Sequence, residues 1–139
     1  MALFGKYVDA YVSISGVDLS NHCKQVTINY SAAMLDASAM GDLTKVNMAG
    51  ILDWSMTFEL EQDYAAGSVD ATLWGIMQNG VAVTLAVRPK KSVSKGAENP
   101  EFGGQAVLAS YNPASGQHGA LLLATATFQC AGTLARTTS

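Results

Sequence analysis

Glu59 and Glu61 are the two residues whose types and spacing most directly suggest acid–base chemistry. Side chains two positions apart lie on the same face of a β-strand, and a pair of carboxylates can act as general acid and general base in glycoside hydrolysis. No pocket-forming aromatic residues accompany these carboxylates on that face. We therefore interpret the pair as part of a solvated strand surface rather than as a catalytic dyad.

The adjacent residues His22 and Cys23 raise a second possibility, a metal ligand pair or a cysteine nucleophile. The chain has one further histidine, His118, and one further cysteine, Cys130, and it contains no CxxC or HExxH spacing. We interpret both cysteines as small buried residues in a reducing compartment. The motifs GxxxxGK[ST], GxGxxG and GxSxG are also absent. The sequence therefore predicts no enzyme, no catalytic residue, no cofactor and no metal site.

The element that carries the two glutamates is a strand over Trp54–Tyr64, in which apolar and polar residues alternate. This period of two predicts one buried face and one solvated face. The apolar set is Trp54, Met56, Phe58 and Leu60, and the polar set is Ser55, Thr57, Glu59 and Glu61.

The rest of the pattern predicts a mainly β chain that forms one domain over residues 1–139. A short arm over residues 1–6 precedes the first strand, and Asn112–Gly116 is predicted as a turn. The fold class is an antiparallel β-sandwich or barrel with one flanking helix. The further predicted strands are Tyr7–Ile14, Lys24–Ser31, Val81–Val87, Gln105–Tyr111 and Leu121–Cys130, with Thr133–Thr137 closing the sheet.

One helix is predicted over Val69–Gln78, with Ser68 as its N-cap and Asn79-Gly80 as a left-handed stop. Because a helix of about three turns needs a sheet to pack against, we expect Trp74 and Met77 to lie on its core side.

Residues 32–52 form no clean helix or strand pattern, so a long loop or flap is predicted there. The segment is rich in apolar and flexible side chains, which suit adaptable contacts. Two interpretations stay open. One is a folded-back flap or hairpin, with Thr44–Met48 as a strand, that completes its own subunit's core; the other, which we favour, is a flap laid across a neighbouring subunit. The candidate subunit contacts are Met34, Leu35, Met40, Leu43, Val46, Met48 and Ile51.

Composition supports self-association. Charged residues make up 14% of the chain against about 25% in typical soluble proteins, and hydrophobic residues make up 49%. This apolar excess indicates a surface covered by copies of the same chain. A net charge of −3 argues against a surface that grips nucleic acid, and neither a membrane span nor a signal peptide is recognisable.

Three of the lysines, Lys90, Lys91 and Lys95, lie close together in a predicted loop that follows Pro89. A solvated loop is one interpretation. The other is a positively charged contact with acidic residues on a neighbouring copy.

Several segments, taken in order, resemble a tail tube (major tail) protein of a long-tailed bacteriophage. They are VDLSNHCKQVTINYSAAMLDASAMGD, NMAGILDWSMTFELEQDYAAGSVDATLW, LASYNP and the ending ATATFQCAGTLAR, and the similarity covers nearly the whole chain.

This resemblance implies a β-sandwich subunit that forms hexameric rings, stacked into a hollow tube through which phage DNA passes. It also implies a virion location after assembly in the host bacterial cytoplasm, and tail terminator, tape measure and tail-tip proteins as partners. Because the lumen of such tubes is often negatively charged, we expect Ser55, Thr57, Glu59 and Glu61 to face it. The alternative is that another sheet face lines the lumen and these residues lie on the outer wall. An acidic lining would repel phosphates and let DNA slide.

Two alternatives remain open. One is another tail component on a related fold, such as a tail terminator or head–tail joining protein. The other is a monomeric ligand-binding β module, for which Trp54 and Trp74 are the available tryptophans, both expected in the core.

Overall fold

A computed structural model describes residues 10–97 and 99–138, and shows a mainly β chain with one α-helix, α1 (Val69–Asn79). The strands form one antiparallel sheet in the order β2-β1-β5-β6-β7-β4-β3, with β8 paired to β6. The predicted arm over residues 1–6 and the start of the predicted strand Tyr7–Ile14 lie outside the described residues. The strands are β1 (Tyr11–Ile14), β2 (Val17–Asp18), β3 (Cys23–Asp36), β4 (Asn47–Glu61), β5 (Val83–Arg88), β6 (Glu101–Ser115), β7 (Leu123–Cys130) and β8 (Ala135–Thr137), and a 3-10 helix covers Ser20–His22.

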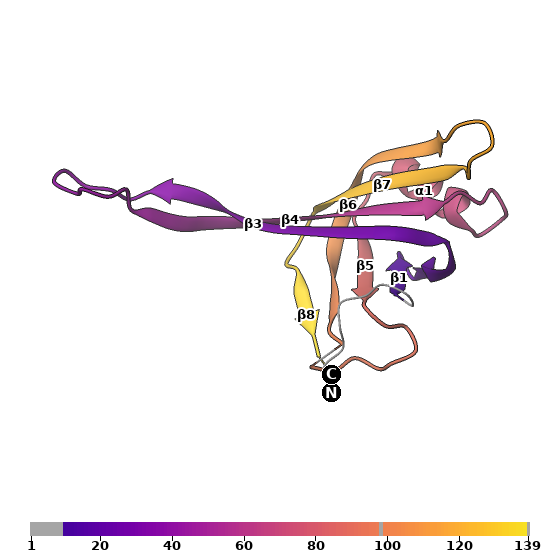
Figure 1. The fold of residues 1–139 in the computed structure, drawn as a ribbon, viewed down its shortest axis with the longest axis horizontal. Helices are drawn as coiled ribbons and strands as arrows, with labels where there is room; N and C mark the ends of the chain where they lie inside the picture. Colours follow the sequence, from indigo (N-terminus) through magenta and orange to yellow (C-terminus); the bar gives the residue numbers. More distant parts are fainter. Residues whose placement is uncertain (1–9, 98, 139) are drawn as a thin grey trace.

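The long strand β6 divides the sheet into two parts that face one another across the core. Its first half pairs with β5 through Phe102–Ala106, and its second half pairs with β7 through Ala106–Ser115. Figure 1 shows β3, β4 and β7 running along the molecule, whereas β1 and β5 run across it. The sheet is therefore folded over on itself in a sandwich-like arrangement, which agrees with the predicted fold class.

The alternation predicted for Trp54–Leu60 is confirmed on β4. Its four apolar side chains are at most 3% exposed, while the polar residues between them are partly exposed. Phe58 packs edge-on against Phe128 with ring centroids 5.7 Å apart, and the Trp54 indole N–H donates to the Gly132 carbonyl at 2.8 Å. β4 thus forms the centre of the core and presents its polar residues on the opposite face.

The turn predicted at Asn112–Gly116 is wrong, because β6 continues as a strand through Ser115. Register shifts between Leu108 and Ser110 and between Asn112 and Ser115 accommodate the turn-forming residues as bulges. Pro113 lies within the second shift, where its missing N–H costs no ladder bond, and its carbonyl accepts from the Tyr64 hydroxyl at 3.0 Å.

Helix α1 begins and ends where the sequence predicts, apart from one residue. Gly80 follows it with φ of +66°, the left-handed conformation that glycine adopts without strain. Ser68 occupies the N-cap position, but its hydroxyl donates to the Asp63 carboxylate at 2.8 Å rather than to the first turn of the helix.

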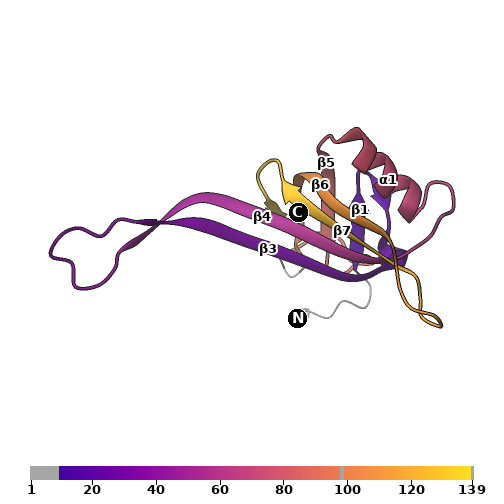
Figure 2. The ribbon, with the colours of Figure 1, turned by 90° about the horizontal axis from the view of Figure 1, so that it is seen from above.

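The core side of α1 differs from the prediction. Val69, Leu73 and Ile76 are buried, whereas Trp74 is 52% and Met77 is 40% exposed. The three buried residues lie on one stripe of the helix. Trp74 and Met77 each follow a buried residue and are rotated by about 100° from it around the helix axis. A narrow contact with the sheet beside β6 therefore buries one stripe and leaves Trp74 and Met77 on its border. Figure 2 shows the helix at the end of the molecule opposite the loop that joins β3 and β4.

Candidate functional site

The most prominent feature of the molecule is a β-hairpin arm, which we define as residues 32–52 of β3, β4 and the loop between them. Figures 1 and 2 show this arm extending far beyond the rest of the molecule. Its ladder pairs Met34 with Ala49, Leu35 with Met48 and Asp36 with Asn47. The segment predicted as a long loop or flap is therefore a hairpin of two strands with a loop at its tip. A register shift between Ala32 and Met34 interrupts the period of two, and neither face of the arm is buried, so the sequence shows no alternation there.

All predicted subunit-contact residues lie on this arm and are exposed. Their exposed fractions range from 46% for Val46 to 104% for Met40. The interpretation that this segment completes its own subunit's core is therefore wrong for the described structure. Exposed apolar side chains concentrated on one segment are typical of a site that binds another protein. Its members are Met34, Leu35, Met40, Leu43, Val46, Met48 and Ile51.

The tip of the arm, residues 37–46, is held in one shape by hydrogen bonds from its own short polar side chains. The Asp36 carboxylate accepts from the Ser38 N–H at 2.9 Å, and Ser38 Oγ accepts from the Val46 N–H at 2.6 Å. The Asp42 carboxylate accepts from the Ala39 N–H at 2.6 Å. The hydrogen bonds from Ser38 hold the pKa of the Asp36 carboxyl below its ordinary value. The tip is thus organised before it meets any partner.

The predicted lumen residues lie together on the polar face of β4. Cross-strand neighbours in an antiparallel pair share a face, so the register extends this polar surface over three strands. Every residue directly opposite Ser55, Thr57 and Glu59 is polar and uncharged. Among these four β4 residues and their partners, Glu59 and Glu61 therefore carry the charge. The rows are Asn29–Ser55–Gln129, Thr27–Thr57–Thr127 and Gln25–Glu59–Thr125, and Glu61 is paired with Leu123.

The predicted lysine cluster lies in the loop between β5 and β6, and two of its members have carboxylate partners within the chain. Lys91 Nζ lies 2.8 Å from Asp18 Oδ2, and Lys95 Nζ lies 3.4 Å from Glu101 Oε2. Burial alone would raise the pKa of Asp18, but hydrogen bonds from Lys91 and Ser20 outweigh it and hold that pKa below its ordinary value of 3.8. A contact of Lys90, Lys91 and Lys95 with a neighbouring copy stays a prediction.

A histidine, a carboxylate and a hydroxyl meet beside α1, a combination that no spacing in the sequence indicated. His22 Nε2 lies 3.7 Å from Asp63 Oδ2 and 3.5 Å from Ser68 Oγ. In a nucleophile–base–acid triad the carboxylate binds the ring nitrogen that faces away from the hydroxyl. Here the hydroxyl donates directly to Asp63, and the same ring nitrogen faces both groups. This geometry supports the helix start and does not activate the hydroxyl.

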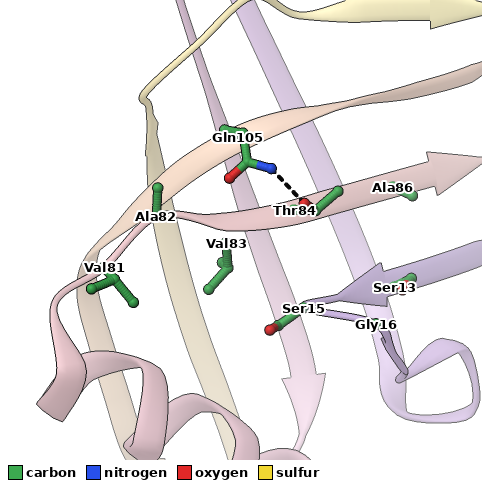
Figure 3. Close-up of a pocket in the computed structure, with 9 residues that line it drawn as sticks. All are labelled: Ser13, Ser15, Gly16, Val81, Ala82, Val83, Thr84, Ala86 and Gln105. Atoms are coloured by element: carbon green, nitrogen blue, oxygen red, sulfur yellow. Dashed lines mark hydrogen bonds between the residues drawn. The ribbon is translucent and has the colours of Figure 1, made fainter.

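A pocket of about 540 Å³ opens where the β1–β2 turn meets the segment that leads into β5 (Figure 3). Gln105 Nε2 donates to Thr84 Oγ1 at 2.6 Å on its wall. None of its lining side chains is titratable, so it offers no acid, base or charged ligand group. The lining is Ser13, Ser15, Gly16, Val81, Ala82, Val83, Thr84, Ala86 and Gln105.

Within the described ranges, no three histidine, cysteine, aspartate or glutamate side chains are grouped to hold a metal ion. Cys23 and Cys130 are free and half-buried, and burial raises the pKa of the Cys23 thiol to about 11. No helix in the part of the chain that the structure describes is long and apolar enough to cross a membrane.

Comparison with family models and with curated proteins gave no match. Comparison with solved structures gave clear ones. A subunit from the tail of an empty gene transfer agent (GTA) particle, refined helically with C6 symmetry, aligns with a TM-score of 0.74 and 17% identity over 98% of this chain and 99% of that one.

The SPP1 tail tube protein aligns with a TM-score of 0.73 and 12% identity, covering 94% of this chain and 77% of that one. Hcp1 from Flavobacterium johnsoniae aligns with a TM-score of 0.58 and 16% identity, covering 94% and 95%. The chain therefore has the fold that these tail and tube subunits share.

Proposed function

We propose that this protein is the structural subunit of a hollow phage tail tube, built from stacked hexameric rings and used to conduct DNA. The observation that carries this proposal is the match to a C6-symmetric tail subunit over nearly the full length of both chains. A binding module that merely reused the fold would not need to keep its whole length and proportions.

The arm supports the proposal because its apolar side chains have no partner within their own described subunit. In an obligate assembly such side chains become the core of an interface. The arm extends far enough to contact another copy within the ring or in the next ring (Figure 1). In this proposal Met34, Leu35, Met40, Leu43, Val46, Met48 and Ile51 are buried between subunits.

The polar face of β4 supports the assignment of the lumen. Ser55, Thr57, Glu59 and Glu61 face the channel in this proposal, among uncharged polar neighbours. Fixed carboxylates repel the phosphates of passing DNA, and the residues paired directly with Ser55, Thr57 and Glu59 add no basic group that would release counterions on binding. DNA therefore slides without being held.

The proposal carries the remaining expectations with it. The protein is located in the virion tail after assembly in the host bacterial cytoplasm, and its partners are further copies of itself, the tail terminator, the tape measure and the tail-tip proteins. Its role is structural and includes no chemical step. Charge contacts between copies are made by Lys90, Lys91 and Lys95. Lys91 and Lys95 contact carboxylates of their own chain, and in the assembly they exchange these for carboxylates of a neighbouring copy or bind both.

Electron microscopy of the purified protein at rising concentration, beside its mass from light scattering, tests this function. Hollow tubes of stacked six-fold rings are the expected result, with growth started by a tail-tip complex if the free subunit is stable alone. Closed rings that never stack would indicate a terminator or joining protein. A monomer that does not grow even on a tail-tip complex would refute the proposal and favour a ligand-binding module.

A further inference from the structure

An apolar hollow of about 330 Å³ lies at the root of the arm, between β3, β6 and the segment that leads into β8. Its lining residues are Ile28, Tyr30, Phe102 and Leu134. A second hollow of about 220 Å³ continues from Tyr30 along the arm to Leu52. None of the residues that line either hollow is charged, and Tyr30 is 54% exposed although it continues the core-facing row of β3. We refer to the two hollows together as the Tyr30 groove.

The tip of the arm carries protruding apolar side chains. Met40 and Leu43 are fully exposed there, on a loop whose backbone is already fixed by Asp36, Ser38 and Asp42. A fixed loop loses little conformational entropy when it docks, so its apolar side chains contribute more of their burial to affinity. Figures 1 and 2 show the tip at the far end of the arm, so the tip and the groove of one chain do not meet.

The two surfaces also carry one pair of opposite charges, Arg136 beside the groove and Asp42 on the tip, whose other charged residue is Lys45. Arg136 of β8 is exposed and lies directly opposite Phe102 in the β6–β8 ladder, at the border of the groove. The structure gives it no carboxylate partner among the described residues. Asp42 lies between Met40 and Leu43 on the tip. A tip that enters the groove therefore brings a carboxylate toward a guanidinium that has no carboxylate partner among the described residues.

We propose that the Tyr30 groove is the receptor for the arm tip of a second copy of this chain, with Met40 and Leu43 as the inserted side chains. This inference rests on the proposed tube function and specifies which surfaces of two neighbouring subunits meet. Head-to-tail assembly requires two different, complementary patches on each subunit. The tip and the groove provide a protruding and a hollow apolar patch on the same chain.

Cysteine cross-linking between two differently tagged copies tests the contact. Both copies carry Cys23→Ser and Cys130→Ser; one adds Leu43→Cys and the other adds Tyr30→Cys. The matched control replaces Tyr30→Cys by Thr84→Cys, an exposed residue of the pocket in Figure 3. After mixed assembly and mild oxidation, we expect a covalent dimer of the two tags with Tyr30→Cys and none with Thr84→Cys.

Tubes that form without this cross-link, or that cross-link equally to the control position, would overturn the inference and leave the tube function standing. If the wild-type chain forms no tubes, the function fails and the inference fails with it. If Tyr30→Cys itself prevents assembly, a charge pair decides. Leu43→Glu alone should stop growth and Leu43→Glu with Tyr30→Lys should restore it, and growth that is not restored refutes the contact.

Discussion

Replacing residues 33–51 by Asn-Gly should separate folding from assembly. Ala32 and Leu52 are directly paired in the β3–β4 ladder, so a two-residue type I′ turn can join them without changing the register of the sheet. The variant lacks every predicted contact residue of the arm and keeps the polar face and the core of β4 intact.

The free energy of unfolding of the monomer should change by no more than about 1 kcal/mol. The removed side chains are 46–104% exposed, so little apolar burial is lost, and exposed substitutions typically change stability by less than about 0.5 kcal/mol each way. Shortening the tip loop also lowers the closure cost by about 1 kcal/mol, which offsets the lost ladder bonds of the arm.

Assembly should suffer far more. Met40, Leu43 and Ile51 are 85–104% exposed, and burying such a side chain contributes roughly 1.5–3 kcal/mol. Losing these three contacts alone removes about 4.5–9 kcal/mol for each arm. Since about 1.4 kcal/mol corresponds to a factor of ten, the critical concentration for growth should rise at least a thousand-fold.

Urea unfolding followed by circular dichroism measures the first quantity, and light scattering with electron microscopy measures the second. Lys45→Ala is the matched control, because it shortens an exposed charged side chain of the tip and leaves every predicted contact residue in place. Assembly of the arm-less variant at the wild-type concentration would refute the assignment of the arm as an interface. Loss of the folded monomer would show that the arm stabilises its own subunit.

Three further predictions concern the polar face, the core and pH. Tubes carrying Glu59→Lys and Glu61→Lys should still form but retain linear duplex DNA in a salt-dependent way, and equal retention of closed circular DNA would place this face on the outer wall. Phe58→Ala should lower the free energy of unfolding by about 3–5 kcal/mol, because Phe58 is fully buried. Trp74→Ala should lower it by less than about 1 kcal/mol in the same urea titration, because Trp74 is half-exposed. Equal losses in the two variants would contradict this difference in burial. Asp18→Asn should be less stable than the wild type at neutral pH, because the folded state lowers the pKa of Asp18. That difference in Tm should shrink as the pH falls below 3.8, whereas a constant difference would mean that its lysine partner adds no stability.

The sequence by itself determined the features that depend on local covalent geometry. The alternation over Trp54–Glu61 identifies a strand and both of its faces, because successive side chains of a strand point in opposite directions. The end of α1 at Gly80 follows from the freedom of glycine to adopt a positive φ.

Tertiary structure decided everything that depends on what packs against each element. Trp74 and Leu73 are neighbours in one helix, yet the sheet covers Leu73 and leaves Trp74 half-exposed. The hydrophobicity of residues 32–52 predicts burial, but the fold carries both strands of the arm beyond the sheet, where the described subunit has nothing to cover them. Periodicity is a property of the backbone, whereas burial depends on contacts between residues distant in sequence, and for this arm on contacts with other molecules.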